Sequence, residues 1–199
     1  MVKKSLKFLL MKLRYFFYNL KFHQVGQGSF LKSPLKIDGA KSITIGSYSY
    51  IGYKVWLASM PLTGEGVSKL NIGDNCSIGN FNHIYATNSI EIKDGVLTAD
   101  KVYISDNIHG YEDVLVNIID QPIIQKNKVI IETGAWLGEN VCVIGASVGR
   151  NSVIGSNSVV TSDIPDFCVA VGAPAKIIKR YCFSRKGWFR TNQDGTFKQ

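Results

Sequence analysis

The sequence predicts an all-β fold, a solenoid of short strands stacked in successive coils. Three observations lead to this prediction: aliphatic residues recur at every sixth position, 19 glycines but only five prolines punctuate the chain, and 45% of its 199 residues are apolar. A chain of this length and apolarity can form one packed domain and is too apolar to be disordered. We expect one domain with an appendage at each end.

The repeat of six begins with Ile45-Gly46 and Ile51-Gly52. Neither a helix nor a flat strand has this period. A two-residue slip and a five-residue step interrupt it. The further positions in phase are Leu57, Ile72, Ile78, Ile84, Ile90, Ile92, Thr98, Ile104, Ile131, Leu137, Val143, Val148, Ile154 and Val160.

This period predicts triangular coils, each of three short segments and about 18 residues, with one aliphatic side chain per segment pointing inward. Glycine follows where the chain bends and a Cβ would clash. Pairs such as Asp74-Asn75 and Ser156-Asn157 suit turns with left-handed backbone. Each coil buries its aliphatic side chains only against the coils above and below, so several coils are required.

The repeat is absent between Ile104 and Ile131, which predicts an excursion loop over residues 105–130. Long loops in compact domains are usually functional or mobile. A shorter break between Ala58 and Leu70 predicts a surface excursion such as a small hairpin.

Charge divides the chain into three parts. Residues 1–36 carry eight bases and no acid, residues 37–175 carry eight bases and 14 acids, and residues 176–199 carry seven bases and one acid. A nucleic-acid-binding protein would carry its basic surface on the body, so we expect no nucleic-acid partner. The two basic ends need a local explanation.

Residues 1–24 form a basic N-terminal segment. Lys3, Lys7, Arg14 and Lys21 recur on one helical face among leucines and phenylalanines, which predicts an amphipathic helix. Such a helix either binds an anionic membrane surface without crossing it or caps the solenoid. Residues 181–199 are expected to be a short tail or helix, at that same surface or partly ordered.

The four cysteines have no paired spacing, and the sequence shows no secretory signal and no apolar stretch of the ~18 residues that a membrane span needs. We expect reduced thiols and a cytoplasmic location. Peripheral contact with the inner face of the membrane is compatible with that location.

The repeat, together with the blocks TGAWLGENV, GSNSVVTSDIP and AVGAPAKIIKRY, resembles the left-handed parallel β-helix, or hexapeptide-repeat, acyltransferases. The resemblance covers residues 25–180. It implies a left-handed coil, acetyl-CoA as co-substrate, no metal, and a homotrimer with its active sites between subunits.

The excursion loop opens with Asp106-Asn107-Ile108-His109-Gly110, which resembles the Asp-x-x-His-Gly segment of the sugar O-acetyltransferases in this family. The resemblance implies a catalytic segment in which His109 is the base and Asp106 takes part. A sugar hydroxyl attacks a thioester poorly unless a base takes its proton, and the pKa of histidine suits that task. Asn107 stands where many relatives have a second histidine. The alternative for His109 is a loop histidine bonded to backbone.

Asn80-Phe81-Asn82 resembles a segment of galactoside and maltose acetyltransferases in which the second asparagine touches the acceptor sugar. The resemblance implies that Asn82, and His83 beside it, bind substrate. A tight coil turn for Asn82 and an ordinary surface position for His83 remain open.

The AVGAPAKIIKRY block resembles the coenzyme-binding end of the family. The small residue Ala173 would let a pantetheine arm lie against backbone, and Lys176, Lys179 and Arg180 would meet the phosphates of CoA. The alternative is that these cations line a solvated helix face.

Two further features belong to this coenzyme end. The indole of Trp136 would pack against the arm, and backbone N–H groups near Gly138 and Glu139 would stabilise the oxyanion. The alternative places Trp136 at a subunit contact.

We therefore expect an acetyl-CoA-dependent O-acetyltransferase acting on a sugar hydroxyl of a surface polysaccharide or its lipid-linked precursor. The alternatives are an antibiotic acetyltransferase, a γ-type carbonic anhydrase and a non-catalytic scaffold. The carbonic anhydrase would need three convergent histidines on zinc, and only His83 and His109 lie in the body.

Overall fold

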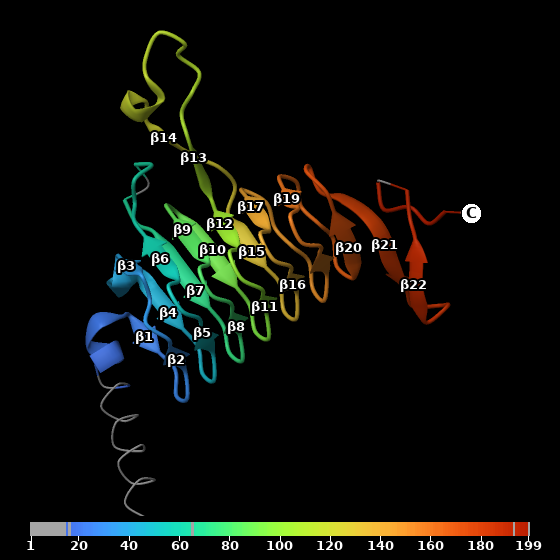
Figure 1. The fold of residues 1–199 in the computed structure, drawn as a ribbon, viewed down its shortest axis with the longest axis horizontal. Helices are drawn as coiled ribbons and strands as arrows, with labels where there is room; N and C mark the ends of the chain where they lie inside the picture. Colours follow the sequence, from blue (N-terminus) through green and yellow to red (C-terminus); the bar gives the residue numbers. More distant parts are fainter. Residues whose placement is uncertain (1–14, 16, 65, 193, 199) are drawn as a thin grey trace, which may run out of the picture.

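The computed structural model describes residues 15, 17–64, 66–192 and 194–198. They form a nearly all-β solenoid in which the chain visits three parallel sheets in turn, here called faces A, B and C (Figure 1).

Face A contains β1 (Gln24–Val25), β4 (Ile43–Ile45), β7 (Lys69–Ile72), β10 (Ser89–Ile92) and β15 (Val129–Ile131). Face B contains β2 (Phe30–Leu31), β5 (Tyr50–Ile51), β8 (Ser77–Ile78), β11 (Leu97–Thr98), β16 (Trp136–Leu137), β18 (Val153–Ile154), β20 (Cys168–Val171), β21 (Lys176–Cys182) and β22 (Gly187–Arg190). Face C contains β3 (Lys36–Asp38), β6 (Trp56–Ser59), β9 (His83–Ala86), β12 (Tyr103–Ser105), β17 (Cys142–Ile144) and β19 (Val159–Val160). Two 3-10 turns are η1 (Ala40–Ser42) and η2 (Ile118–Asp120).

The repeat of six is confirmed as the pattern of the core. Every one of its positions from Ile45 to Val160 is buried, and they stack coil upon coil, as Ile72 does on Ile92 in face A. The glycines that follow them are required by the stacking. A Cβ on Gly79 would lie 2.3 Å from the carbonyl oxygen of Ala99 in the next coil.

The prediction of one inward side chain per segment is incomplete. A second buried row lies two residues earlier along the chain, and in face B it contains Ser49, Cys76 and Val96. In an extended segment, residues two apart point to the same side, so the residue two before each repeat position also faces the interior. This row also holds the buried Cys168, and all four cysteines are free thiols.

The expected coil of 18 residues is only an average. Ile72 pairs with Ile92, 20 residues on, whereas Leu137 pairs with Ile154, 17 residues on. The coils differ because their corners differ: the corner after β9 is wide enough to include Thr87 and Asn88 before β10 begins.

Between β12 and β15 the chain leaves the three faces. β13 (Asn107–His109) and β14 (Ile123–Gln125) pair antiparallel, and the segment between them projects away from the solenoid (Figure 1). The hairpin expected between Ala58 and Leu70 is wrong for the described residues there, which form turns. Those turns reach the long loop, because the Thr63 hydroxyl donates to Gln125 Oε1 at 2.8 Å.

Most of the predicted N-terminal amphipathic helix lies outside the described residues. Its described end is helical as far as Lys21 and contacts the solenoid. Phe22 is buried in the core, Tyr18 packs edge-on against it, and the Tyr18 hydroxyl donates to the Leu31 carbonyl at 3.2 Å. These residues cover the first coil. In the described part of the chain, no helix has the length and apolarity to span a membrane.

The tail or helix expected for residues 181–199 is wrong, and so is a boundary at residue 180. β21 runs through that boundary to Cys182, pairs antiparallel with β20, and forms a hairpin with β22. Strand pairing is favoured because β20 would otherwise expose the unpaired edge of face B at the end of the solenoid.

Candidate active site

His109 ends β13 at the base of the projecting loop and is exposed. Three backbone contacts hold the foot of the projecting loop in place. The strand Asn107–His109 pairs with Ile123–Gln125. The Gly110 amide donates to the Pro122 carbonyl at 2.8 Å, and the Lys126 amide donates to the Asp106 carbonyl at 2.8 Å. No protein partner for the His109 ring is found among the described residues. Its ring is therefore open to a ligand while its backbone is held rigidly.

Asp106 lies three residues earlier and is fully buried. Its carboxylate accepts bonds at 2.8 Å from the amides of Thr87, Asn88 and Ser89, and at 3.0 Å from the Thr87 hydroxyl. Burial alone would raise the pKa of Asp106, but these donors reverse the effect and lower it below its usual value. The carboxylate thus holds the wide corner after β9. The structure places Asp106 against that corner, whereas the sequence grouped it with His109 as catalytic.

Asn82 is buried and faces the interior. It lies two residues before Ile84, in the second inward row, where its side-chain oxygen accepts from the Val102 amide at 2.6 Å and its nitrogen donates to the Thr98 hydroxyl. The substrate contact expected for Asn82 is therefore wrong in this structure. The alternative, a residue that supports a coil turn, is what the structure shows.

His83 faces outward from face C, where cross-strand register stacks aromatic rings from three coils. Its ring lies parallel to that of Trp56 with centroids 4.1 Å apart, and Tyr85 and Tyr103 approach it at 5.7 and 5.3 Å. Its Nε2 is buried and has no hydrogen-bond partner. Burial lowers the pKa of His83, so its ring is neutral near pH 7.

The sequence argument missed this aromatic stack, which comprises Trp56, His83, Tyr85 and Tyr103. The signal was present, because Trp56, His83 and Tyr103 each come one residue before a repeat position and so face outward in register. Single positions along the chain do not reveal it until the coils are aligned.

At the expected coenzyme end, Trp136 begins β16 on face B with 47% of its surface exposed. The Gly138 amide is committed to the ladder, donating to the Ile154 carbonyl at 2.8 Å. The Gly138 amide therefore cannot serve as an oxyanion donor without breaking that hydrogen bond of the sheet. This corrects the expectation that the amide of Gly138 stabilises the oxyanion. The Glu139 side chain forms an exposed ion pair with Lys101 at 3.2 Å.

The three cations of β21 do not share one side of the strand. Lys176 pairs with the exposed Val171 and Lys179 with the half-buried Val169, whereas Arg180 pairs with the buried Cys168. Partners across an antiparallel pair point to the same side, so Lys176 and Lys179 face outward and Arg180 faces the end of the coil. The alternative of a solvated helix face is wrong, because this segment is a strand.

Ala173 is exposed in the turn between β20 and β21. The turn is tied to face C: the Gly172 amide donates to the Ser158 hydroxyl at 3.0 Å, and the Ala175 amide donates to the Val159 carbonyl at 2.8 Å. A fixed backbone bearing only a methyl group leaves room for a thin ligand beside it.

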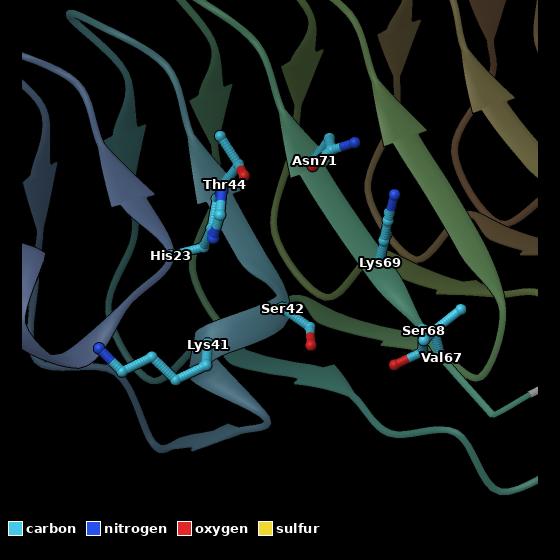
Figure 2. Close-up of a pocket in the computed structure, with 8 residues that line it drawn as sticks. All are labelled: His23, Lys41, Ser42, Thr44, Val67, Ser68, Lys69 and Asn71. Carbon is cyan, nitrogen blue, oxygen red and sulfur yellow. The ribbon is translucent and has the colours of Figure 1, made fainter.

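Two hollows on the described surface bear on the site. One of about 330 Å³ lies on face A between His23, Lys41 and Lys69, but the two lysines point in different directions, and Lys41 donates to the Leu20 carbonyl (Figure 2). The other, of about 340 Å³, lies within the projecting loop, between residues of the segment 110–124, and Gly110, the neighbour of His109, is one of the residues that line it. Only the second adjoins the candidate catalytic segment.

No group of three potential metal ligands converges among the described residues. His83 and His109 belong to different sheets, and His23 is in a third location.

Comparison with known proteins adds the family. A protein of Escherichia coli named as a lipopolysaccharide biosynthesis O-acetyl transferase, WbbJ, is 39% identical over 165 residues, which cover 79% of this chain and 82% of WbbJ. A protein of Mycobacterium tuberculosis named as an acetyltransferase is 41% identical over 138 residues, and the match spans 69% of this chain but 44% of that longer relative. No family model matches the chain.

Among solved structures, the N-acyltransferase AntD of Bacillus cereus, in complex with a dTDP-sugar and coenzyme A, aligns with a TM-score of 0.71 at 18% identity. The alignment covers 86% of this chain and 91% of AntD. The fold is thus that of the β-helical acyltransferases. With WbbJ aligned over most of both chains, this protein belongs to the hexapeptide-repeat acetyltransferases.

Proposed function

We propose that the protein is an acetyl-CoA-dependent O-acetyltransferase that modifies a sugar hydroxyl of a surface polysaccharide or its lipid-linked precursor. The observation that carries the proposal is the exposed side chain of His109, on a strand that is held by pairing with β14, in a chain of this family. The next residue, Gly110, lines the hollow in the loop.

In this proposal His109 is the general base. It takes the proton of the acceptor hydroxyl as the oxygen attacks the acetyl carbonyl, and the thiolate of CoA leaves. Asp106 is a positioning residue that does not contact the substrate, because its hydrogen bonds to the corner after β9 fix the point from which the loop departs. The Glu139 amide is the remaining candidate for the oxyanion donor.

The coenzyme would bind along the exposed Trp136, the Ala173 turn, and the outward-facing Lys176 and Lys179. Strand register aligns Trp136 with Lys179, through Val153 and Val169, on the outer side of face B. An indole, a turn bearing a methyl group and two cations would suit the pantetheine and phosphate parts of CoA. Arg180 would contribute only at the end of the coil. AntD, which shares the fold, is named with coenzyme A bound.

For the acceptor, the aromatic stack around His83 offers a flat, partly apolar surface at the side of β12, the strand that leads into the His109 segment. A sugar ring can pack its C–H face on such a surface while its hydroxyls reach polar groups beside it. WbbJ is named for lipopolysaccharide biosynthesis, which favours a polysaccharide acceptor over an antibiotic.

We further propose a homotrimer. In one chain, Trp136 lies on face B whereas His109 lies beyond face C, so the base of one subunit would meet the coenzyme surface of a neighbour. The tip of the loop supports this, because Val114, Leu115 and Ile119 are 91, 92 and 84% exposed. Apolar side chains this exposed usually mark a contact surface.

We place the protein in the cytoplasm, with its N-terminal segment at the inner membrane face. The class of acceptor can be tested directly: radiolabelled acetyl-CoA is offered with a panel of lipid-linked and free oligosaccharides, with chloramphenicol as the antibiotic arm. Label in an alkali-labile ester on an oligosaccharide supports the proposal. Label on chloramphenicol alone contradicts it.

A further inference from the structure

The C-terminal hairpin of β21 and β22 carries an outward surface of which the proposed function uses only Lys179. It lies at the opposite end of the sheet order from β2, at the far end of the solenoid from β1 and β2 (Figure 1). Its register is continuous from Lys179–Arg190 to Cys182–Gly187. Lys179, Tyr181, Trp188 and Arg190 therefore occupy one face of the hairpin as two cross-strand pairs.

The two faces of this hairpin differ. On the inner face, the guanidinium of Arg185 stacks on Phe189 at 3.8 Å and lies 5.1 Å from Phe197, and Gly195 packs near Ile177. Phe197 and Gly195, from the segment after β22, thus cover that face. The described residues leave the outer face more open: Trp188 is 44% exposed, and Phe183, at the tip, is 65% exposed.

Among the described residues, the cations of the outer face have no acidic partner. Lys179 pairs directly with Arg190, an arrangement of like charges that is unfavourable on a bare hairpin. None of the four ion pairs in the described part of the chain involves a residue of the hairpin. Asp194, the one acid after residue 175, bonds to Thr196. An anionic partner would relieve the repulsion.

The chemistry of this surface matches one partner. Trp188 stacks edge-on with Tyr181 at 5.6 Å, and Tyr181 with Phe183 at 5.1 Å, so amphipathic aromatic rings lie beside Lys179, Lys186 and Arg190. Tryptophan and tyrosine concentrate at the headgroup level of membranes, where nearby lysine and arginine meet lipid phosphates. We propose that the outer face of the hairpin docks on an anionic lipid bilayer, with Trp188 and Phe183 at the headgroup level.

This surface would provide a second attachment at the end of the solenoid opposite the predicted N-terminal one. It depends neither on the identity of the acceptor nor on His109. Each cation near an anionic surface contributes roughly fivefold in partitioning, so two contribute about 25-fold at low salt.

The test uses the full-length protein and vesicles of phosphatidylglycerol and phosphatidylcholine, with brominated acyl chains as a short-range quencher of tryptophan. We expect quenching of the wild type, and loss of most of it in Trp188→Phe, which keeps an aromatic ring but leaves only Trp56 and Trp136 to report. Because the quenching is local, attachment through the N-terminal segment alone does not reproduce it. Equal quenching in Trp188→Phe overturns the proposal.

A charge variant supplies the second measurement. Lys186→Gln with Arg190→Gln should weaken binding to anionic vesicles about 25-fold at low salt and leave binding to pure phosphatidylcholine unchanged. Lys32→Gln with Lys54→Gln, which removes the same charge from exposed positions in the first coils, is the matched control and should have a much smaller effect. Melting temperature and acetyl-CoA turnover with a soluble acceptor confirm that each variant is folded.

Three results would overturn the proposal. They are an equal loss of vesicle binding in the control pair, an unchanged vesicle affinity with a raised KM for acetyl-CoA in the hairpin pair, and equally tight binding to duplex DNA that depends on the same two residues. The second result would assign the hairpin to the coenzyme, and the third would make it a general polyanion site.

Discussion

The Asp106 carboxylate lies in the coil above Thr87 and accepts hydrogen bonds from both its amide and its hydroxyl, at 2.8 and 3.0 Å. The same carboxylate also binds the amides of Asn88 and Ser89. One buried side chain thus fixes the wide corner that lies directly beneath the departing loop. His109 stands three residues beyond this anchor.

Replacing Asp106 by Asn should therefore destabilise the protein. With the Asn107 side-chain nitrogen, which also donates to the Asp106 carboxylate at 3.1 Å, there are five donors, and an amide cannot accept from all of them. Each buried donor left unpaired costs about 1–3 kcal/mol. Urea denaturation at pH 7 should show a lower unfolding free energy for Asp106→Asn, with a substantial loss of turnover. Asp113→Asn, an exposed acid in the loop, is the control and should change stability little.

The effect should depend on pH with a definite sign. Because the folded-state pKa of Asp106 is lowered, its contribution is fully present above the unfolded pKa of about 3.9 and is lost as the pH falls through the folded value. The stability difference between wild type and Asp106→Asn should be constant from pH 5 to 7 and shrink below pH 4. A difference that persists undiminished to the lowest accessible pH would contradict this.

Replacing His109 by Ala should lower kcat by about 10²–10⁴, since it removes the general base, while affinity for acetyl-CoA is retained. Stopped assays at saturating substrates and calorimetry with CoA separate the two quantities. His23→Ala, at a histidine on face A, serves as the control. More than half of wild-type kcat in His109→Ala would exclude His109 as the base.

The cations of β21 should contribute unequally. Lys176→Gln with Lys179→Gln should raise the KM for acetyl-CoA more than that for the acceptor, and more strongly at low salt, because both face outward. Arg180→Gln should have the smaller effect, because Arg180 lies on the side of the buried Cys168. Equal effects of the pair and of Arg180→Gln would mean that strand register does not govern coenzyme contact.

The projecting loop should hold the trimer together. Leu115→Ser with Ile119→Ser replaces two almost fully exposed apolar residues, and light scattering should show dissociation together with loss of activity. Leu62→Ser, at a 45% exposed leucine in the shorter break, is the control. A wild-type protein that is monomeric and fully active would remove the basis of this prediction.

We expect the two parts of the N-terminal segment to have different functions: Phe22 stabilises the first coil, and residues 2–14 bind anionic membranes. Phe22→Ala should lower the unfolding free energy by about 3–5 kcal/mol, because Phe22 fills the first coil. Deleting residues 2–14 should leave the melting temperature nearly unchanged while weakening salt-sensitive binding to anionic vesicles. A deletion that melts early without any change in vesicle binding would assign the whole segment to capping.

The sequence by itself determined the solenoid, because a coil of this kind repeats one local rule. An aliphatic residue followed by glycine meets the same neighbours in each coil, so the positions from Ile45 to Val160 could be read as core without knowledge of distant contacts. The departure of the chain after Ile104 was visible for the same reason, as a place where the rule stops. The aliphatic pattern likewise showed that Ile131 resumes the coil.

The tertiary structure decided which side chains a ligand can reach. Asn82 and His83 are adjacent in sequence, yet Asn82 is bonded to Val102 and Thr98 in the interior, whereas His83 stacks on Trp56 outside. Likewise, a bulge between Val169 and Ala170 sets Lys179 outward and Arg180 toward the coil end. Register between strands far apart in the chain decides these outcomes, and a one-residue change in register reverses every side chain of a strand, which local sequence does not specify.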